Sequence, residues 1–395
     1  MKFRCERDVL VEALGGATRA VATRGGALPV LSGVKFELRG DRLVLTGSDL
    51  DLTIQVAVTV AGEVDGIAVL PGRLVGDIVR SLDPGAVHLE VADAEARIAS
   101  GRSHFSVRLL PADDFPRVPD APTEEVRLDA ASLVDALRQV VPAASHDDAR
   151  PILTGVLMAA EGDGLRLVAT DSYRLAVRDL PGVSVLREGQ SVLVPSRALG
   201  ELARLLSGAG TVSLRLGERD ATFEVGNFAP GDSGGDDGGG SAGGGDGGGG
   251  SPGDSDGGVR LTTRLIEGQF PNYRQLIPES HPNRLTVGRE PLLDALRRVK
   301  LLAREAIPVR LALRAGGVEL TAVTQDVGQA DEEIDAKYEG TEMGISFNPE
   351  YLVDGIDAVE GDEVTLHTLD GLKPAVVRSV ERQDFLYLLM PIRVS

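Results

Sequence analysis

The sequence predicts an α+β protein made of three tandem copies of one domain, each with two helices and about eight strands in antiparallel sheets. Three observations predict this. A strand that runs into a helix occurs three times, strand patterns follow it each time, and a second amphipathic helix comes after those strands. Similarity of several elements in one order indicates repeats. We expect the domains to cover residues 1–122, 123–278 and 279–395.

The first pattern, a short strand followed by a helix, covers residues 3–14, 126–137 and 285–296. The helical assignment rests on apolar residues that recur at helical spacing. In the first copy the spacing places five residues on one face: Val9, Leu10, Ala13, Leu14 and Ala17. We expect this face to be buried.

The middle of each copy predicts strands and then the second helix. Residues 43–49, 165–171 and 318–324 alternate apolar and other side chains, as half-buried strands do. The helix patterns that follow cover residues 71–80, 195–204 and 348–357. Each has a proline near its first turn, where the missing N–H leaves no hydrogen bond unmade.

Residues 231–258 interrupt the second copy with 16 glycines in 28 positions. This composition cannot bury apolar surface, so we expect a disordered coil. The insert falls between two strand patterns, residues 223–228 and 259–263. Extra length in such a hairpin loop costs little closure entropy, which favours an inert extruded loop. A tether or a partner site is the alternative.

Cysteine usage and hydropathy exclude several classes. The single cysteine, Cys5, excludes an internal disulfide and a Cys-rich metal site. The first eight residues are charged where a signal peptide needs an apolar run, and no apolar stretch of 18 residues occurs. We therefore expect a cytoplasmic protein.

The charged residues fit two interpretations, a DNA-binding surface and ordinary solvent-exposed helix faces. The net charge is −19, and the insert holds six of the acidic side chains. An acidic balance argues against a nucleic-acid binder. However, Arg73 and Arg80 lie seven residues apart on one second helix, and so do Arg197 and Arg204 on the next, so each pair shares a helix face. A helix face that is simply exposed to solvent shows the same spacing of charged residues, so the spacing fits both interpretations. The second helix of the third repeat departs from this pattern, because it carries acidic residues at positions 350 and 354.

Two alternatives to DNA binding are an enzyme and an acidic scaffold. The five histidines stand in five separate segments, and no H-E-x-x-H, G-x-S-x-G, P-loop or C-x-x-C motif occurs. Residues 48–49 (SD) and 170–171 (TD) occupy equivalent repeat positions. Since Ser, Thr and Asp side chains bond the nearby backbone, these pairs predict turns rather than a metal or acid site. We expect no catalytic residue, metal or cofactor.

Six motifs occur in order: the opening MKF, then residues 28–31 (LPVL), 45–50 (LTGSDL), 169–176 (ATDSYRLA), 264–273 (RLIEGQFPNY) and 389–393 (LMPIR). With them the chain resembles the bacterial DNA sliding clamp, the β subunit of DNA polymerase III, everywhere except residues 231–258. The resemblance implies three clamp domains in a half ring, and a homodimer that closes head to tail around duplex DNA. It implies a non-catalytic, nucleoid-associated processivity factor without cofactors. A diverged or resistance-type paralogue is the alternative within this family.

The resemblance also implies three sets of site residues. A pocket for short peptide motifs of the polymerase, the clamp loader and repair factors would be lined by Leu153, Thr170, Ser172, Tyr173, Arg174, Leu175, Pro271, Gln275, Leu276, Asn348, Tyr351, Leu388, Leu389, Met390, Pro391 and Arg393. DNA would face Arg24, Arg73, Arg80, His146, Arg150, Arg197 and Arg204. The dimer contact would join Phe105 and Val107 to Leu301 and Leu302.

Two features of the pocket set qualify it. Tyr173 and Gln275 stand where the family often has other polar residues, which predicts a shifted peptide preference. Read from the residues alone, the apolar run 388–392 is more typical of a last core strand than of a pocket. Even so, leucine and methionine with a few polar groups suit a groove that accepts varied apolar peptides.

Overall fold

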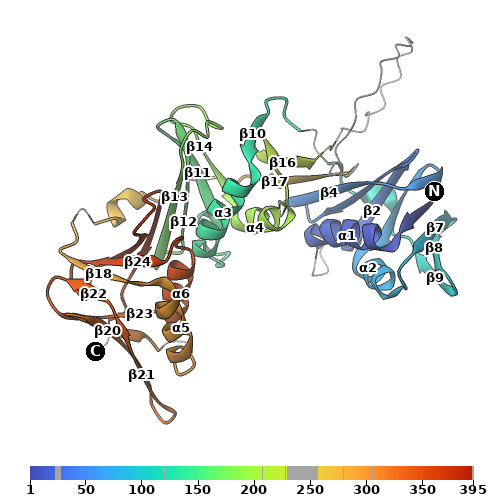
Figure 1. Cartoon of the computed structure of the whole chain (residues 1–395). Helices are drawn as coiled ribbons and strands as arrows, with labels where there is room; N and C mark the ends of the chain where they lie inside the picture. The colour runs from blue at the N-terminus through green and yellow to red at the C-terminus, as the bar shows by residue number, and fades with distance from the viewer. Residues whose placement is uncertain are drawn as a thin grey trace, which may run out of the picture. The chain divides into compact units, whose positions relative to one another are not determined.

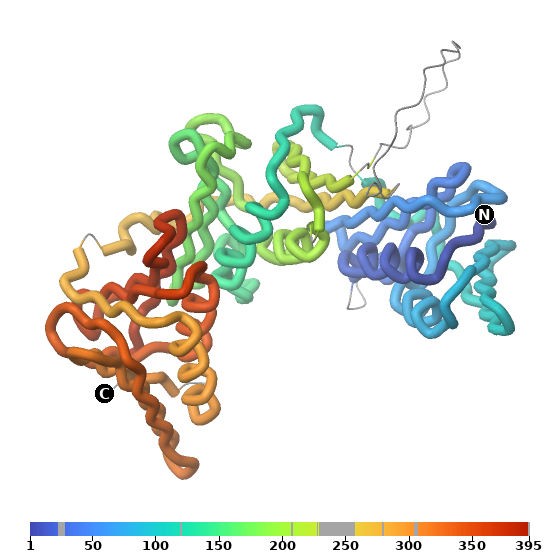
Figure 2. Tube along the Cα trace, in the orientation of Figure 1, coloured from blue at the N-terminus to red at the C-terminus, as the bar shows by residue number. Residues whose placement is uncertain are grey.

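The computed structural model describes residues 1–22, 28–118, 121–206, 208–226, 228, 257–278, 280–303 and 307–393 (Figures 1 and 2). They form two compact units. Unit 1 comprises Met1–Ala131 and Arg204–Arg264, and unit 2 comprises Ser132–Ala203 and Leu265–Ser395. Two expectations, the position of Arg24 and the structure of insert residues 231–256, lie outside the described residues.

The described residues contain six α-helices, two from each repeat of the sequence. They are α1 (Arg7–Ala17), α2 (Gly72–Ser81), α3 (Ala130–Val140), α4 (Ser196–Leu205), α5 (Arg289–Val299) and α6 (Pro349–Asp357). Figure 1 shows α1 beside α2 in unit 1 and α5 beside α6 in unit 2, in agreement with their contacts. All six predicted helices are therefore confirmed. None of the described helices is long and apolar enough to cross a membrane.

Helix α1 shows one wrong prediction. Leu10, Ala13, Leu14 and Ala17 are fully buried, as expected, but Val9 is 39% exposed. Val9 lies roughly a quarter turn from the centre of the apolar stripe, so it falls at the margin of the buried face.

Unit 1 holds two antiparallel sheets. One has the order β5-β1-β7-β8-β9, from β1 (Lys2–Glu6), β5 (Ala61–Val64), β7 (Ala86–Ala92), β8 (Glu95–Ser100) and β9 (Ser103–Arg108). The other has the order β10-β15-β16-β17-β4-β3-β2-β6, from β2 (Gly33–Arg39), β3 (Arg42–Ser48), β4 (Leu52–Thr59), β6 (Gly66–Pro71), β10 (Val126–Asp129), β15 (Thr211–Leu216), β16 (Asp220–Gly226) and β17 (Gly258–Arg264). Its β4–β17 pairing joins strands of the first and second repeats.

Unit 2 also holds two antiparallel sheets. The larger has the order β14-β11-β12-β13-β26-β25-β24-β18-β22, from β11 (Gly155–Glu161), β12 (Gly164–Thr170), β13 (Arg174–Leu180), β14 (Ser191–Pro195), β18 (Asn283–Gly288), β22 (Lys337–Glu339), β24 (Glu363–Thr368), β25 (Ala375–Ser379) and β26 (Phe385–Leu389). The smaller has the order β21-β20-β19-β23, from β19 (Val309–Arg314), β20 (Gly317–Thr324), β21 (Gly328–Asp335) and β23 (Met343–Phe347). The β13–β26 pairing joins the second and third repeats.

The strands that flank the insert form the predicted hairpin, because β16 pairs antiparallel with β17. The predicted end of the insert at residue 258 is wrong. Gly258 is the first residue of β17, where it pairs with Gly226 on one side and Ala57 on the other. Glycine composition predicted coil, but the ladder of the neighbouring strands continues through this residue.

The cores follow the predicted strand alternation. Leu43 and Leu45 of β3 are fully buried, and so are Leu165 and Leu167 of β12. Helix α1 lies very close to β3, because a Cβ on Gly47 would lie 2.0 Å from the carbonyl oxygen of Ala17. Only glycine allows this approach of helix to strand.

Candidate peptide site, DNA-facing helices and dimer contact

A tight turn recurs in the first two repeats and places the first part of the candidate site. Its positive-φ residue is Leu50 (83°) in the first and Ser172 (81°) in the second. The third repeat differs, because its positive-φ residue, Asp326 (63°), stands one position later and Thr324 takes the place of the aspartate. In the first turn Asp49 Oδ1 accepts a hydrogen bond from the backbone N–H of Leu52 at 2.8 Å. In the second, Asp171 Oδ1 accepts hydrogen bonds from two backbone N–H groups in the same way, at 2.9 and 3.0 Å. The prediction that these Asp residues shape turns is confirmed.

The β13–β26 pairing brings the second turn to the end of the chain. Arg174 lies opposite Leu389, and Leu175 lies opposite Leu388. The N–H of Met390 donates to the carbonyl of Tyr173 at 2.9 Å. Residues more than 200 positions apart in the sequence thus meet at one end of the larger sheet of unit 2.

Arg174 ties this end of the sheet to helix α6. Its side chain is 7% exposed and donates to Asp171 at 3.0 Å and to Asp354 at 2.5 Å. Burial alone would lower the pKa of the guanidinium, but the Tyr387 hydroxyl and the two carboxylates raise that pKa above its usual value. Arg174 is therefore charged at neutral pH. This contact explains one of the two acidic residues of the third repeat's second helix, because Asp354 is the α6 partner of the buried arginine, whereas Glu350 pairs with Lys300.

An aromatic pair lies above this charge network. The Tyr173 and Tyr351 rings stack with centroids 6.5 Å apart and planes at 30°. The Arg174 guanidinium lies 4.2 Å from the centroid of Tyr351. Tyr351 is half-buried and its carbonyl accepts from the Tyr387 hydroxyl at 2.9 Å, whereas Tyr173 is 60% exposed. One ring is thus part of the scaffold and the other is presented to solvent.

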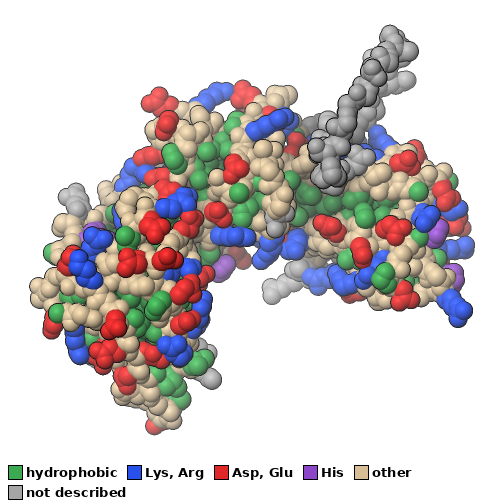
Figure 3. Space-filling model, viewed as in Figure 1, with side chains coloured by type: hydrophobic (Ala, Val, Ile, Leu, Met, Phe, Trp, Pro, Cys, Tyr) green, Lys and Arg blue, Asp and Glu red, His purple; other side chains and the backbone are tan. Residues whose placement is uncertain are grey.

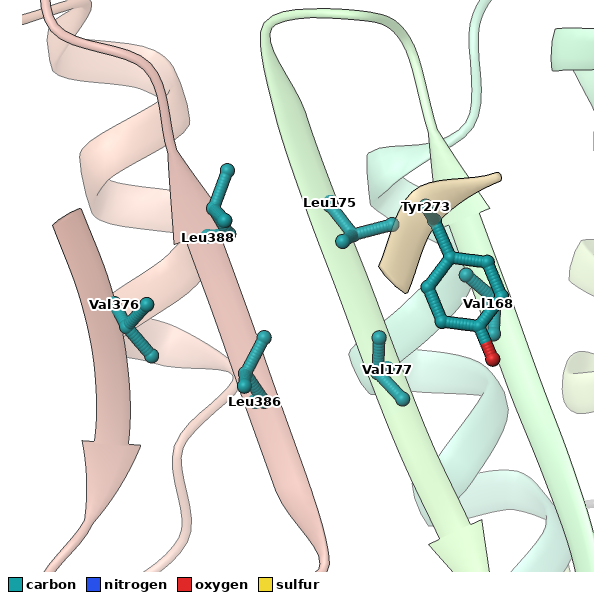
Figure 4. Close-up of a cluster of buried hydrophobic side chains, with 7 residues drawn as sticks. All are labelled: Val168, Leu175, Val177, Tyr273, Val376, Leu386 and Leu388. Carbon is teal, nitrogen blue, oxygen red and sulfur yellow. The ribbon is translucent and has the colours of Figure 1, made fainter. Parts of the chain in front are cut away.

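A buried apolar cluster forms the floor of the site. Figure 4 shows its members on β12, β13, β25 and β26 together with Tyr273 of the short 3-10 helix Tyr273–Leu276: Val168, Leu175, Val177, Tyr273, Val376, Leu386 and Leu388. Arg274 next to Tyr273 pairs with Glu161 at 2.6 Å, which anchors this helix to β11. The segment that connects the second and third repeats therefore crosses the sheet and covers part of its apolar face.

The predicted pocket residues separate into three groups by exposure, all within unit 2. Six are buried: Leu153, Thr170, Arg174, Leu175, Leu388 and Leu389. Four are half-buried: Asn348, Tyr351, Met390 and Pro391. Six are exposed: Ser172, Tyr173, Pro271, Gln275, Leu276 and Arg393. Asn348 also has a structural role, because its Oδ1 caps α6 by accepting from the N–H groups of Glu350 and Tyr351.

Sequence reasoning missed Leu372 at the same end of the sheet. The turn between β24 and β25 carries it, 61% exposed, and Ala375 at the start of β25 lies opposite Leu389. The signal was available, because an exposed leucine after the turn dipeptide Asp370-Gly371 has no place in a strand pattern.

A histidine pair extends the apolar floor toward β18. The rings of His281 and His367 lie edge to face, 5.8 Å between centroids. Burial, His281, Arg284 and Arg378 lower the pKa of His367 to about 4, and burial with Arg378 lowers the pKa of His281. Both imidazoles are therefore neutral at pH 7.

The histidine pair predicts a pH dependence of stability. A histidine whose pKa is lower in the folded than in the unfolded chain stabilises fully above about pH 6.5 and loses that contribution as the pH falls toward 4. We expect His367→Gln to lose less stability than the wild type between pH 7 and 4.5, measured by urea unfolding. His88→Gln, at an exposed position of β7, is the control. Parallel pH profiles of wild type and His367→Gln would contradict the prediction.

The described DNA-facing candidates lie on exposed positions, as expected. Arg73 and Arg80 lie on the exposed face of α2, opposite the buried Val75 and Val79. Arg197 and Arg204 repeat this arrangement on α4. His146 and Arg150 are exposed in the loop after α3, where Arg150 pairs with Asp147 at 2.9 Å. Figure 3 shows basic and acidic side chains interspersed over both units.

The dimer candidates include an exposed apolar patch on unit 2. Leu301 is 72% exposed, and the Thr324 hydroxyl donates to the carbonyl of the half-buried Leu302. That contact places the β20–β21 turn beside the end of α5, so Val327 (69% exposed) of this turn joins the patch. Sequence reasoning missed this valine. Figure 2 shows this hairpin projecting from the rest of unit 2.

The candidates on unit 1 lie on β9, the last strand of its sheet, which has one unpaired edge. Phe105 is 37% exposed and Val107 is buried. A second chain could therefore meet the Phe105 ring and the backbone of β9, while Val107 supports the strand from within. Leu74 of α2 is also 51% exposed.

Three family models match consecutive parts of the chain. They describe the N-terminal domain of the DNA polymerase III beta subunit at residues 1–119, the central domain at 127–230 and the C-terminal domain at 274–393. The chain is 32% identical to the beta sliding clamp of Streptomyces coelicolor, with 100% of both sequences covered. It belongs to the DNA polymerase III beta subunit family, the bacterial sliding clamps.

Other sliding clamps agree with this assignment. The beta sliding clamp of Staphylococcus aureus is 30% identical, with 100% of this chain and 99% of that one covered. The solved clamp of Bartonella birtlesii, bound to griselimycin, superposes with a TM-score of 0.85 at 30% identity, and that of Bacillus subtilis with 0.84 at 28%, each over the full length of both chains. The three-domain α+β clamp fold is thereby confirmed, and the chain is a processivity subunit rather than an enzyme.

Proposed function

We propose that two copies of this clamp subunit close head to tail into a ring around duplex DNA, with domains at residues 1–122, 123–278 and 279–395. The ring holds the replicative polymerase, the clamp loader and repair proteins through short peptide motifs. The protein works in the cytoplasm at the nucleoid. It needs no cofactor, because topology rather than chemistry retains it on DNA.

The observation that carries the proposal is the site at the β13–β26 end of unit 2. Tyr173, Met390 and Leu372 are exposed or half-buried at the end of the sheet where β13 pairs with β26, the two strands that carry the fully buried Leu175 and Leu388. An apolar surface with a few polar groups suits a short peptide with apolar anchors. The Bartonella birtlesii clamp binds griselimycin, so this fold can hold a ligand.

Substitution of Met390 tests this site more clearly than substitution of Leu175. We expect Met390→Ala to weaken binding of a peptide from the polymerase of the same organism about tenfold, the usual cost of truncating an apolar anchor. Isothermal titration measures this. Leu175→Ala is unsuitable, because truncating a fully buried leucine costs about 2 to 5 kcal/mol of folding stability.

A matched control is available at the far end of the neighbouring strand. Val380 follows the opposite end of β25 and is 37% exposed, so Val380→Ala should leave the affinity unchanged. Unchanged affinity in Met390→Ala would move the site elsewhere. No binding to the wild type would favour a diverged paralogue or a scaffold over a working replication clamp.

DNA binding is proposed to use the exposed arginines of α2 and α4. Phosphate attraction without base contacts gives every register along the duplex nearly the same energy, which permits sliding. We expect Arg73→Glu with Arg197→Glu to reduce loading on primed circular DNA several-fold at low salt, because two attractive charges become repulsive. Arg314→Glu, 63% exposed on β19, is the control. Equal loading of all three proteins would contradict this assignment.

A further inference from the structure

Tyr173 is the most exposed Phe or Tyr side chain among the described residues, and its turn does not require an aromatic residue. The equivalent turn of the first repeat has nearly the same φ before it, 83° at Leu50 against 81° at Ser172, yet carries Asp51 at this position. The Asp49 and Asp171 carboxylates shape both turns. Backbone geometry therefore explains Asp171 and Ser172, and leaves the ring at position 173 unexplained.

The backbone of Tyr173 is fixed by hydrogen bonds, and its ring stacks on a neighbouring ring. Its N–H donates to Asp171 at 2.9 Å, its carbonyl accepts from Met390 at 2.9 Å, and its ring stacks on Tyr351. A tyrosine side chain has only two torsion angles, so this ring, 60% exposed, loses little entropy when a ligand side chain packs against it. The backbone bond from Met390 places residue 173 next to Met390, the apolar anchor position of the site.

Aromatic rings in this protein repeatedly hold an arginine. Arg174 lies 4.2 Å from the Tyr351 centroid, Arg260 lies 4.3 Å from that of Phe228, and Arg274 lies 5.6 Å from that of Tyr273. Within the described ranges no Lys or Arg lies over the Tyr173 ring. The net charge of −19 also favours the approach of a cationic peptide.

We propose that Tyr173 is a specificity-determining residue of the peptide site, and that its ring receives the guanidinium of a peptide arginine beside the apolar anchor. The inference rests on the proposed function. The attraction arises because the negative face of the ring meets a planar cation. Partners with an arginine at this position would be bound in preference to partners with a neutral side chain there.

The test is a positional scan of the polymerase peptide, with each residue replaced in turn by Arg, Phe or Gln. At one position we expect the Arg peptide to bind the wild-type clamp about two- to fivefold more tightly than the Gln peptide, the range for an exposed cation–π contact. Tyr173→Phe keeps the ring and should keep the preference. Tyr173→Leu keeps an apolar side chain but should abolish the preference, so that this variant binds the Arg and Gln peptides with equal affinity.

The matched control is Asp51→Leu, at the same turn position in the first repeat, which should bind both peptides as the wild type does. A preference that survives in Tyr173→Leu overturns the assignment. A preference for Phe equal to that for Arg also overturns it, because the ring would then be a general apolar wall. Peptide binding with no preference at any position overturns this inference alone, whereas no binding to the wild type overturns the proposed peptide site as well.

Discussion

Aspartates at Leu301 and Val327 should convert the clamp from a dimer into monomers without unfolding either unit. Both side chains are exposed on unit 2, at 72% and 69%, and would be buried by the proposed contact with a second copy. Burying an aliphatic side chain contributes about 1.5 to 3 kcal/mol. A ring closed by two such contacts would bury four of these side chains, so the double variant should lose about 6 to 12 kcal/mol of association free energy.

Light scattering measures this outcome directly. The wild type should have twice the mass of the double variant at micromolar concentration. The melting temperature of the monomeric double variant should reflect the stability of its two folded units alone. Leu372→Asp is the matched control, since Leu372 is 61% exposed on unit 2 but lies at the peptide site. A monomeric wild type, or a double variant that stays dimeric, would sink the head-to-tail ring.

Replacement of Arg174 by methionine should cause the largest loss of folding stability. The side chain is 7% exposed and bonds Asp171, itself 7% exposed, and Asp354. Methionine fills similar volume but leaves buried carboxylate charge without its partner. Breaking a buried ion pair from one side costs about 3 to 5 kcal/mol.

The loss of stability should be confined to unit 2, and removing the unpaired carboxylate should restore part of it. Amides of β13 and β26 should exchange faster with solvent, while those of β2 to β4 stay unchanged, because Arg174 connects only the former to α6. Adding Asp354→Asn to Arg174→Met should cost less than the sum of the two single changes. Arg138→Met, with a side chain 69% exposed on α3, should change stability by less than about 0.5 kcal/mol. A small effect at Arg174 would show that the network is not a source of stability.

Helices and hairpins could be predicted from the sequence because their signals are local. Apolar spacing identified all six helices, and the alternation around Leu43 and Leu165 identified their strands. The β4–β17 and β13–β26 pairings could not be predicted, since pairing partners that lie 200 residues apart share no local pattern. Val9 failed for a related reason: periodicity gives a stripe but not its width.

The sequence could predict which residues belong to the candidate site, but not how those residues are arranged. The family motifs named Arg174 and Asn348 as pocket residues, and the structure gives both a supporting role: one is the centre of a buried charge network and the other a helix cap. The sequence alone gives no sign that Arg174 is buried, because its partners Asp171 and Asp354 come from different repeats and meet only in the folded chain. Leu372 and Val327 needed the turn geometry of the structure before their exposure could be recognised.

The sheets shared between repeats have a consequence for synthesis on the ribosome. Strand β13 ends at Leu180, and its neighbour β26 begins at Phe385, about 200 residues later in the sequence. At about 5 to 20 residues per second, the open edge of β13 waits roughly 10 to 40 s for its partner. Unpaired edges of this kind invite pairing with other nascent chains. Chaperone occupancy on translating ribosomes should therefore persist until β26 has been made, and deletion of β26 should leave unit 2 aggregation-prone rather than merely shortened.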